Sequence, residues 1–181
     1  LGGEHLLTLS MVKAYVEKYP ELSVLQLDAH ADLRDQYQGT RYSNACVMRR
    51  VSELCPIVQV GIRSFSLEEY RFIQEQKIKM FHAEASTSPD FVFQLLHSLS
   101  PQVYVSIDLD VFDPSIMSAV GTPEPGGLSW QQVLELLRAV ARNKKIVGFD
   151  LTELCPREGP NSCAFLAAKL AYKLIGYSIS F

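Results

Sequence analysis

The sequence predicts an α/β fold in which a mainly parallel β-sheet lies between two layers of helices. Short apolar runs without polar alternation indicate strands that are buried on both faces, as in parallel sheets. Apolar residues at helical spacing separate these runs, as expected of strand–helix–strand units. Carboxylates and imidazoles directly follow several of the runs. We therefore expect a three-layer α/β/α domain with polar groups gathered at the carboxyl edge of its sheet.

The first elements alternate between helix and strand. The spacing of apolar residues predicts a helix over residues 6–19, which Pro20 ends. Residues 22–27 form an apolar run rich in branched side chains and predict a buried strand. A polar stretch over residues 33–44 precedes a short helical pattern, and residues 57–62 predict the next strand.

The second half of the chain continues this alternation. No repeat or long linker interrupts it, so we expect residues 1–181 to form a single domain. Two capping-box patterns, Ser66 with Glu69 and Ser129 with Gln132, each open a helix. The remaining elements are strands over residues 78–81, 103–107 and 146–149, a helix that begins at Ser88-Pro89-Asp90, and a terminal helix over residues 163–175.

The composition argues against several functional classes. The net charge is −3 and the basic residues are scattered, so we expect no nucleic-acid partner. No apolar run reaches the roughly 18 residues of a membrane span, and we expect a cytoplasmic protein without a membrane partner. The cysteines lack CxxC spacing and are expected to be buried, reduced thiols. They are Cys46, Cys55, Cys155 and Cys163.

The stretch Asp28-Ala29-His30-Ala31-Asp32 directly follows the predicted strand over residues 22–27. Side chains alternate between the two faces of a strand, so we expect Asp28, His30 and Asp32 to point the same way. A single acidic residue after a strand often only solvates a loop. Three potential ligands in phase favour a shared site instead.

A second group of carboxylates follows the predicted strand over residues 103–107. Asp108 and Asp110 are two residues apart and are expected to share a face. His5, after a Gly-Gly turn, is either a further ligand or a surface imidazole. Carboxylates with a minority of imidazoles suit Mn²⁺ or a similar octahedral ion. The ligands exceed what one ion needs, so we infer two ions bridged by shared carboxylates.

Two polar residues near this edge have plainer interpretations. Asp113 stands in the turn before Pro114 and is expected to bind backbone amides there. Arg63 follows a predicted strand and is expected to anchor a loop or a carboxylate rather than to contact substrate.

Four motifs together resemble the ureohydrolase family, which includes arginase and agmatinase. The resemblance implies an arginase-like α/β/α fold. The forms of residues 121–127 and 32–37 are more similar to agmatinase than to arginase. The motifs are Gly2-Gly3-Glu4-His5, Asp28-Ala29-His30-Ala31-Asp32, Ser106-Ile107-Asp108-Leu109-Asp110 and Gly121-Thr122-Pro123-Glu124-Pro125-Gly126-Gly127-Leu128.

The resemblance implies a dinuclear manganese site, with two Mn²⁺ per chain. Its bridging ligands would be Asp28 and Asp108. One ion would be held by His5, Asp28, Asp32 and Asp108, and the other by Asp28, His30, Asp108 and Asp110.

The resemblance also implies the reaction and its catalytic positions, which are Asp32, Glu153 and position 44. Glu153 would bind the guanidinium of a small substrate through two parallel hydrogen bonds. A metal-bridging hydroxide would hydrolyse the guanidino carbon to give urea and an amine, and for agmatine that amine is putrescine. The resemblance further implies a homo-oligomer.

The chain departs from the family pattern in two ways. Asn44 stands where the agmatinase-like members carry a histidine that passes protons to the leaving amine. Because asparagine does not titrate near neutral pH, we expect intact metal binding and turnover slowed by about 10²–10⁴-fold. The family's strands before the Gly-Gly-Glu-His turn are missing here. We therefore expect a fragment without its amino-terminal part, with residues 146–149 at an unpaired sheet edge.

These departures leave two alternatives to an agmatinase-like hydrolase. The chain could be a catalytically impaired homologue that keeps the metal or guanidino site as a binding module. It could also be a ureohydrolase for another guanidino compound, such as guanidinobutyrate or arginine. Competition among these compounds would separate the substrates.

Overall fold

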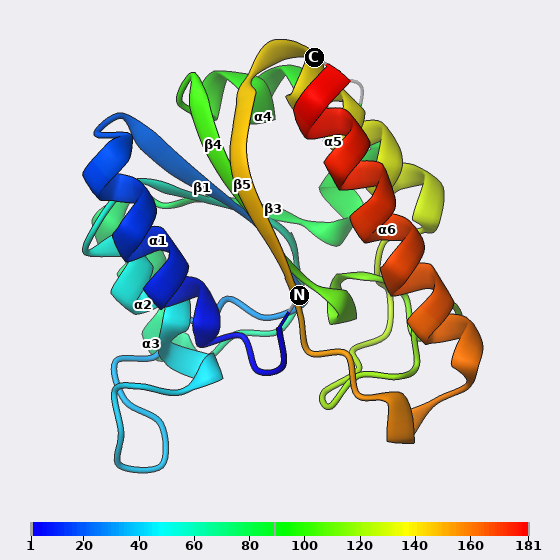
Figure 1. Ribbon diagram of the computed structural model, residues 1–181. Coiled ribbons are helices and arrows are strands. Elements are labelled where there is room, and N and C mark those ends of the chain that lie inside the picture. Colours follow the sequence, from blue (N-terminus) through cyan, green and yellow to red (C-terminus); the bar gives the residue numbers. More distant parts are fainter. Residues whose placement is uncertain (1, 89, 181) are drawn as a thin grey trace.

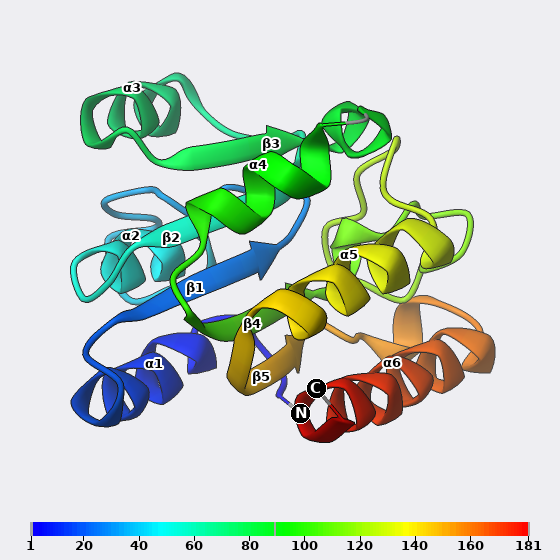
Figure 2. The same ribbon diagram turned by 90° about the horizontal axis from the view of Figure 1, so that it is seen from above.

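The computed structural model describes residues 2–88 and 90–180 and contains a parallel five-stranded sheet. Its strand order is β3-β2-β1-β4-β5, which Figure 2 shows from one edge of the sheet to the other. The strands are β1 (Leu22–Leu27), β2 (Ile57–Ile62), β3 (Lys79–His82), β4 (Gln102–Asp108) and β5 (Lys145–Thr152).

Six α-helices cover the two faces of the sheet in the described residues. Figure 1 shows α1, α2 and α3 on one face and α4, α5 and α6 on the other. Each face has its own apolar core, so the predicted three-layer α/β/α architecture is confirmed. The helices are α1 (Leu7–Lys18), α2 (Val47–Ser52), α3 (Leu67–Gln76), α4 (Phe91–Ser98), α5 (Trp130–Asn143) and α6 (Asn161–Ser180).

The central strands are buried for the reason that the sequence suggested. Every residue of β1 and β2 is buried, and so is every residue of β4 after Gln102. Helices pack on both faces of these strands, so apolar side chains are needed on both. The predicted edge position of residues 146–149 is also confirmed, because in the described chain β5 pairs with β4 alone.

Both predicted capping boxes are present. The hydroxyl of Ser66 accepts the Glu69 N–H, and the Glu69 carboxylate accepts the Ser66 N–H. Ser129 and Gln132 make the same reciprocal pair at the start of α5. Pro89, in the expected start of α4, lies outside the described residues.

Several boundaries differ from the prediction. The terminal helix is longer than predicted, as α6 covers Asn161–Ser180 rather than residues 163–175. The strand β5 extends beyond the apolar run to include buried Asp150 and Thr152. All four cysteines are free, and Cys46 and Cys163 are buried as predicted. Within the described residues, no helix combines the length and the apolar character that crossing a membrane requires.

Candidate metal centre

The candidate metal centre lies at the carboxyl edge of the sheet, where β1 and β4 end side by side. Asp28 directly follows β1, and Asp108 is the last residue of β4. The turn before α1 brings His5 to the same edge, because Gly2 N–H donates to the Leu151 carbonyl at 3.0 Å. Chain segments that are far apart in sequence therefore converge on one site.

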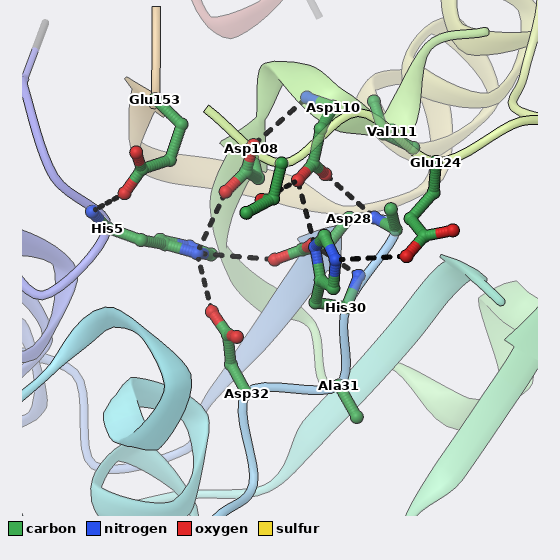
Figure 3. A network of polar contacts seen from close by, with 12 residues as sticks. His5, Asp28, His30, Ala31, Asp32, Asp108, Asp110, Val111, Glu124 and Glu153 are labelled. Carbon is green, nitrogen blue, oxygen red and sulfur yellow. Dashed lines mark hydrogen bonds and ion pairs between the residues drawn. The ribbon is translucent and has the colours of Figure 1, made fainter. Parts of the chain in front are cut away.

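His5 lies at the centre of the first group of potential ligands, as Figure 3 shows. Its Nδ1 is 3.0 Å from Asp32 Oδ2, 3.2 Å from Asp28 Oδ2 and 3.5 Å from Asp108 Oδ2. His5 is fully buried, so the surface-imidazole alternative is wrong. The atoms of His5, Asp28 and Asp32 are close enough together to hold one metal ion.

His30 forms a second group with the neighbouring carboxylates. Its Nδ1 is 2.9 Å from Asp110 Oδ2 and 3.7 Å from Asp28 Oδ1. Asp28, His30 and Asp110 can also hold an ion, so Asp28 belongs to both groups. Asp28 faces one group with Oδ2 and the other with Oδ1. This arrangement has the form expected of a bridged pair of sites.

Asp28, His30 and Asp32 come together at the site, but not through the strand alternation that the sequence predicted. Strand alternation does not align Asp28, His30 and Asp32, because β1 ends at Leu27. The backbone instead turns, and Asp32 adopts a left-handed conformation with φ +54°. Asp32 also accepts two N–H groups from α2 at its carbonyl. The turn therefore places its side chain beside His5.

The two imidazoles are surrounded by negative charge. Burial opposes a charge on His5, but hydrogen bonds to Asp28 and Asp32 outweigh it and raise the pKa of His5 well above its usual value. Burial likewise opposes a charge on His30, but Asp110 and Asp28 raise its pKa to about 11. Both imidazoles therefore carry a second proton and a positive charge at neutral pH, unless a metal cation replaces that proton.

The carboxylates also perturb one another. Burial and the charge of Asp28 raise the pKa of Asp32 to about 7. Burial and the charges of Asp110 and Asp28 raise the pKa of Asp108. Burial would raise the pKa of Asp28 too, but hydrogen bonds with the two imidazoles hold it well below its usual range. A divalent cation suits this donor set, since it would offset the repulsion among buried carboxylates.

Of the three expected catalytic positions, Asp32 belongs to the cluster, and Glu153 and Asn44 lie beside it. Glu153 follows β5, and its Oε1 accepts the backbone N–H of His5 at 2.6 Å. Its backbone is left-handed, with φ +63°, and its N–H donates to the Gly3 carbonyl. Asn44 opens a short 3-10 turn and is half-buried, and its N–H donates to the Glu4 carboxylate at 2.9 Å.

The plainer interpretations of Arg63 and Asp113 are confirmed. The Arg63 guanidinium donates to backbone carbonyls that include those of Asp110 and Glu124, both at 2.7 Å. It therefore ties two loops at the edge of the site together. The Asp113 carboxylate accepts backbone N–H groups, including those of Ser115 and Gly126, at 3.0 Å.

Sequence reasoning missed other polar residues at the site. Gln26 donates to Asp28 Oδ2 at 2.7 Å, and Glu124 Oε1 lies 3.8 Å from His30 Nε2. Gln26 and Ser106 are buried polar residues that interrupt apolar strands, each two residues before an aspartate of the cluster. This two-residue spacing could have predicted their role, since it places each polar side chain on the face of the strand that leads to the site.

Comparisons with known proteins agree with this geometry. Residues 1–176 match the arginase family. The chain is 43% identical over 181 residues to an N(1)-aminopropylagmatine ureohydrolase of Synechocystis sp., covering 98% of the chain and 59% of the relative. It is 44% identical over 179 residues to an agmatinase of Pyrococcus horikoshii, covering 98% of the chain and 62% of that protein.

Solved structures support the same assignment. The agmatine ureohydrolase of Thermoplasma volcanium superposes with a TM-score of 0.87 at 33% identity, covering 98% of this chain and 60% of that one. The arginase of Bacillus caldovelox shares the fold, with a TM-score of 0.86 at 23% identity, covering 97% of this chain and 67% of that one. The chain thus spans about three fifths of the length of the two relatives compared by sequence. With the match over residues 1–176, it belongs to the arginase family.

Proposed function

We propose that this chain forms the metal-holding part of a ureohydrolase that hydrolyses a small guanidino compound to urea and an amine. The observation that carries the proposal is the convergence of two imidazoles and four aspartates on one sheet edge beside Glu153. The named activities of the relatives support agmatine or its aminopropyl derivative as the substrate class.

We propose two Mn²⁺ ions as the cofactor. When bound, such a pair supplies Lewis acidity and makes water a stronger acid. The carboxylate-rich donor set lacks thiolates, which suits Mn²⁺ better than a structural zinc ion. We propose His5, Asp28, Asp32 and Asp108 as the ligands of one ion, and Asp28, His30, Asp108 and Asp110 as those of the other.

Glu153 is our proposed partner for the substrate guanidinium. A carboxylate matches the planar donor fork of a guanidinium, which fixes the orientation of the group that reacts. Burial raises the pKa of Glu153, and a bound guanidinium would favour its charged form. The backbone hydrogen bond between Glu153 and Gly3 links this residue to the segment that carries His5. Substrate binding and metal holding would therefore share one support.

Asn44 limits the proposed reaction. An amide holds no exchangeable proton of suitable pKa, so it gives no acid help to the departing amine. The Asn44 N–H is held by the carboxylate of Glu4, next to His5 in the chain. We infer that position 44 belongs to the site and that this residue slows turnover without weakening metal binding.

The test is urea release from agmatine by the Mn²⁺-loaded chain, with Asn44→His assayed in the same preparation. We expect the variant to release urea about 10²–10⁴-fold faster, because it restores a group that titrates near neutral pH. Equal rates would show that position 44 passes no proton. Glu153→Gln is the matched control. It should lose urea release but keep its Mn²⁺ affinity.

Competition assays then define the substrate. Agmatine, aminopropylagmatine, guanidinobutyrate and arginine each carry a guanidinium but differ at the opposite end. We propose that the cationic compounds compete best, since the chain has a net charge of −3 and many carboxylates at this edge. Preference for arginine or guanidinobutyrate would contradict this substrate class. We also propose a homo-oligomer, to be tested by sedimentation.

A second candidate function is a binding module without turnover. Asn44 favours it, since it removes the proposed proton carrier and leaves the aspartates and histidines in place. This candidate predicts guanidino binding in the presence of Mn²⁺, measured by calorimetry, with no urea from the chain but urea release from Asn44→His. Silence of both would point to truncation instead.

A further inference from the structure

A chain of buried hydrogen bonds lies behind His5, on the side away from the aspartate cluster. His5 Nε2 is 2.9 Å from Ser106 Oγ, and Ser106 donates to Asp150 Oδ1 at 2.9 Å. Ser106 and Asp150 are direct neighbours in the pairing of β4 with β5. Asp150 Oδ2 also accepts hydroxyl groups from Thr8 at 2.9 Å and Tyr104 at 2.8 Å.

The number of available protons fixes the direction of these hydrogen bonds. A hydroxyl group has one proton, and an ionised carboxylate can only accept. Ser106, Thr8 and Tyr104 each donate their proton to Asp150, so the 3.2 Å contact between the Thr8 and Ser106 hydroxyls has no proton in this arrangement. Ser106 Oγ therefore offers His5 only a lone pair, so the proton of this hydrogen bond must belong to His5 Nε2.

This assignment leaves Nδ1 of His5 as the atom that faces the aspartates. Nδ1 lies 3.0–3.5 Å from oxygens of Asp32, Asp28 and Asp108. When a cation replaces the proton on Nδ1, the Nδ1 lone pair can bind it together with these carboxylates. The hydrogen bonds through Ser106 to Asp150 thus keep the His5 proton on Nε2 and leave Nδ1 to bind a metal.

Packing of the core does not explain why Asp150 is a carboxylate. It is 3% exposed, and a buried carboxylate costs free energy that an apolar residue of similar size would avoid. Its hydroxyl partners come from α1 and β4, and two of them are fully buried neighbours on the same face of β4, at positions 104 and 106. Metal-binding histidines usually donate their second ring N–H to such a supporting group.

We propose that Ser106 and Asp150 are positioning residues that hold His5 with its proton on Nε2, so that Nδ1 is the metal-binding atom. The inference rests on the metal site of the proposed function. Loss of such a support typically weakens metal affinity by about 10–100-fold. We expect a loss of this size for Ser106→Ala and for Asp150→Asn.

The matched control is Ser23→Ala. Ser23 is also a fully buried strand serine, but it lies at the opposite end of the adjacent strand β1, where its hydroxyl accepts the Ser100 N–H. Both serine variants remove one buried hydroxyl, so both lose some thermal stability. Only Ser106→Ala should lose affinity when Mn²⁺ binding is measured by calorimetry.

A second measurement uses the unmodified chain and does not depend on any variant folding. In the Zn²⁺-loaded chain, ¹⁵N NMR of the imidazoles reports which ring nitrogen of His5 carries the proton. We expect the proton on Nε2, and a proton on Nδ1 would overturn the inference. Equal Mn²⁺ affinity of Ser106→Ala and Ser23→Ala would overturn it as well. If the unmodified chain bound no metal, the proposed function would fail together with this inference.

Discussion

Replacing Arg63 with lysine should destabilise the chain and loosen the candidate metal centre. Arg63 follows β2, and its guanidinium donates to the carbonyls of Asp110 and Glu124 at 2.7 Å each. Longer bonds reach Gly61 and Pro125 at 3.1 Å. Lysine keeps the charge, but its single nitrogen cannot span two loops as the guanidinium fork does.

The size of the effect follows from the two shortest bonds. A hydrogen bond to a charged group contributes about 1.5–3 kcal/mol, and we expect lysine to keep one of the two. The net loss is then about 1.5–3 kcal/mol. In a chain of 181 residues, each kcal/mol lowers the melting temperature by about 2–4 °C. The expected decrease is therefore about 3–12 °C.

Thermal melting followed by circular dichroism measures this shift, and a Mn²⁺ titration of the same samples measures the affinity. Arg49→Lys is the control, because the Arg49 guanidinium lies over the Phe72 ring of α3 instead of bridging the loops of the site. The control should lose about 1 kcal/mol or less. A shift for Arg63→Lys that is no larger than the control would refute the anchoring role.

Three further predictions concern charge, capping and thiol reactivity. With EDTA present, the raised pKa values of His30 (about 11) and Asp32 (about 7) add stability at low pH that is lost as pH rises through them, so the chain should melt at a lower temperature at pH 9 than at pH 6. Ser129→Ala should lose the cap of α5 and about 1 kcal/mol in urea unfolding. Burial raises the pKa of Cys55 to about 11, so iodoacetamide at pH 8 should alkylate it roughly 100-fold more slowly than a free cysteine.

The central strands and the capped helices could be predicted from the sequence because their signals are local. Residues 22–27 and 57–62 read as apolar runs, and both are buried strands. The end of β5 could not be predicted this way, because Asp150 and Thr152 are polar residues inside a strand. Both have hydrogen-bond partners on β4: the Ser106 hydroxyl donates to the Asp150 carboxylate, and the Thr152 hydroxyl donates to the Ile107 carbonyl.

The residues that gather at the candidate metal centre could be predicted, but the contacts that support them could not. The cluster follows strand ends, and parallel strands all end at the same edge. These contacts join residues that are distant in the sequence. His5 is hydrogen-bonded to Ser106, 101 residues away, and the Ala29 N–H donates to the Asp110 carboxylate, 81 residues away. The turn at Asp32 was missed because a left-handed aspartate leaves no pattern in hydrophobicity.

Glu153 has a left-handed backbone, which is unusual for a residue with a long side chain. A residue with a Cβ pays roughly 1–2 kcal/mol in this conformation, and aspartate or asparagine tolerates it better than glutamate. Glycine at position 153 would relieve this strain, but it would lose the hydrogen bond that the His5 N–H donates to Glu153 Oε1 at 2.6 Å. The same variant would remove the carboxylate that we propose for the guanidinium. One strained residue thus holds the backbone of His5 and would also present the carboxylate that we propose for the substrate.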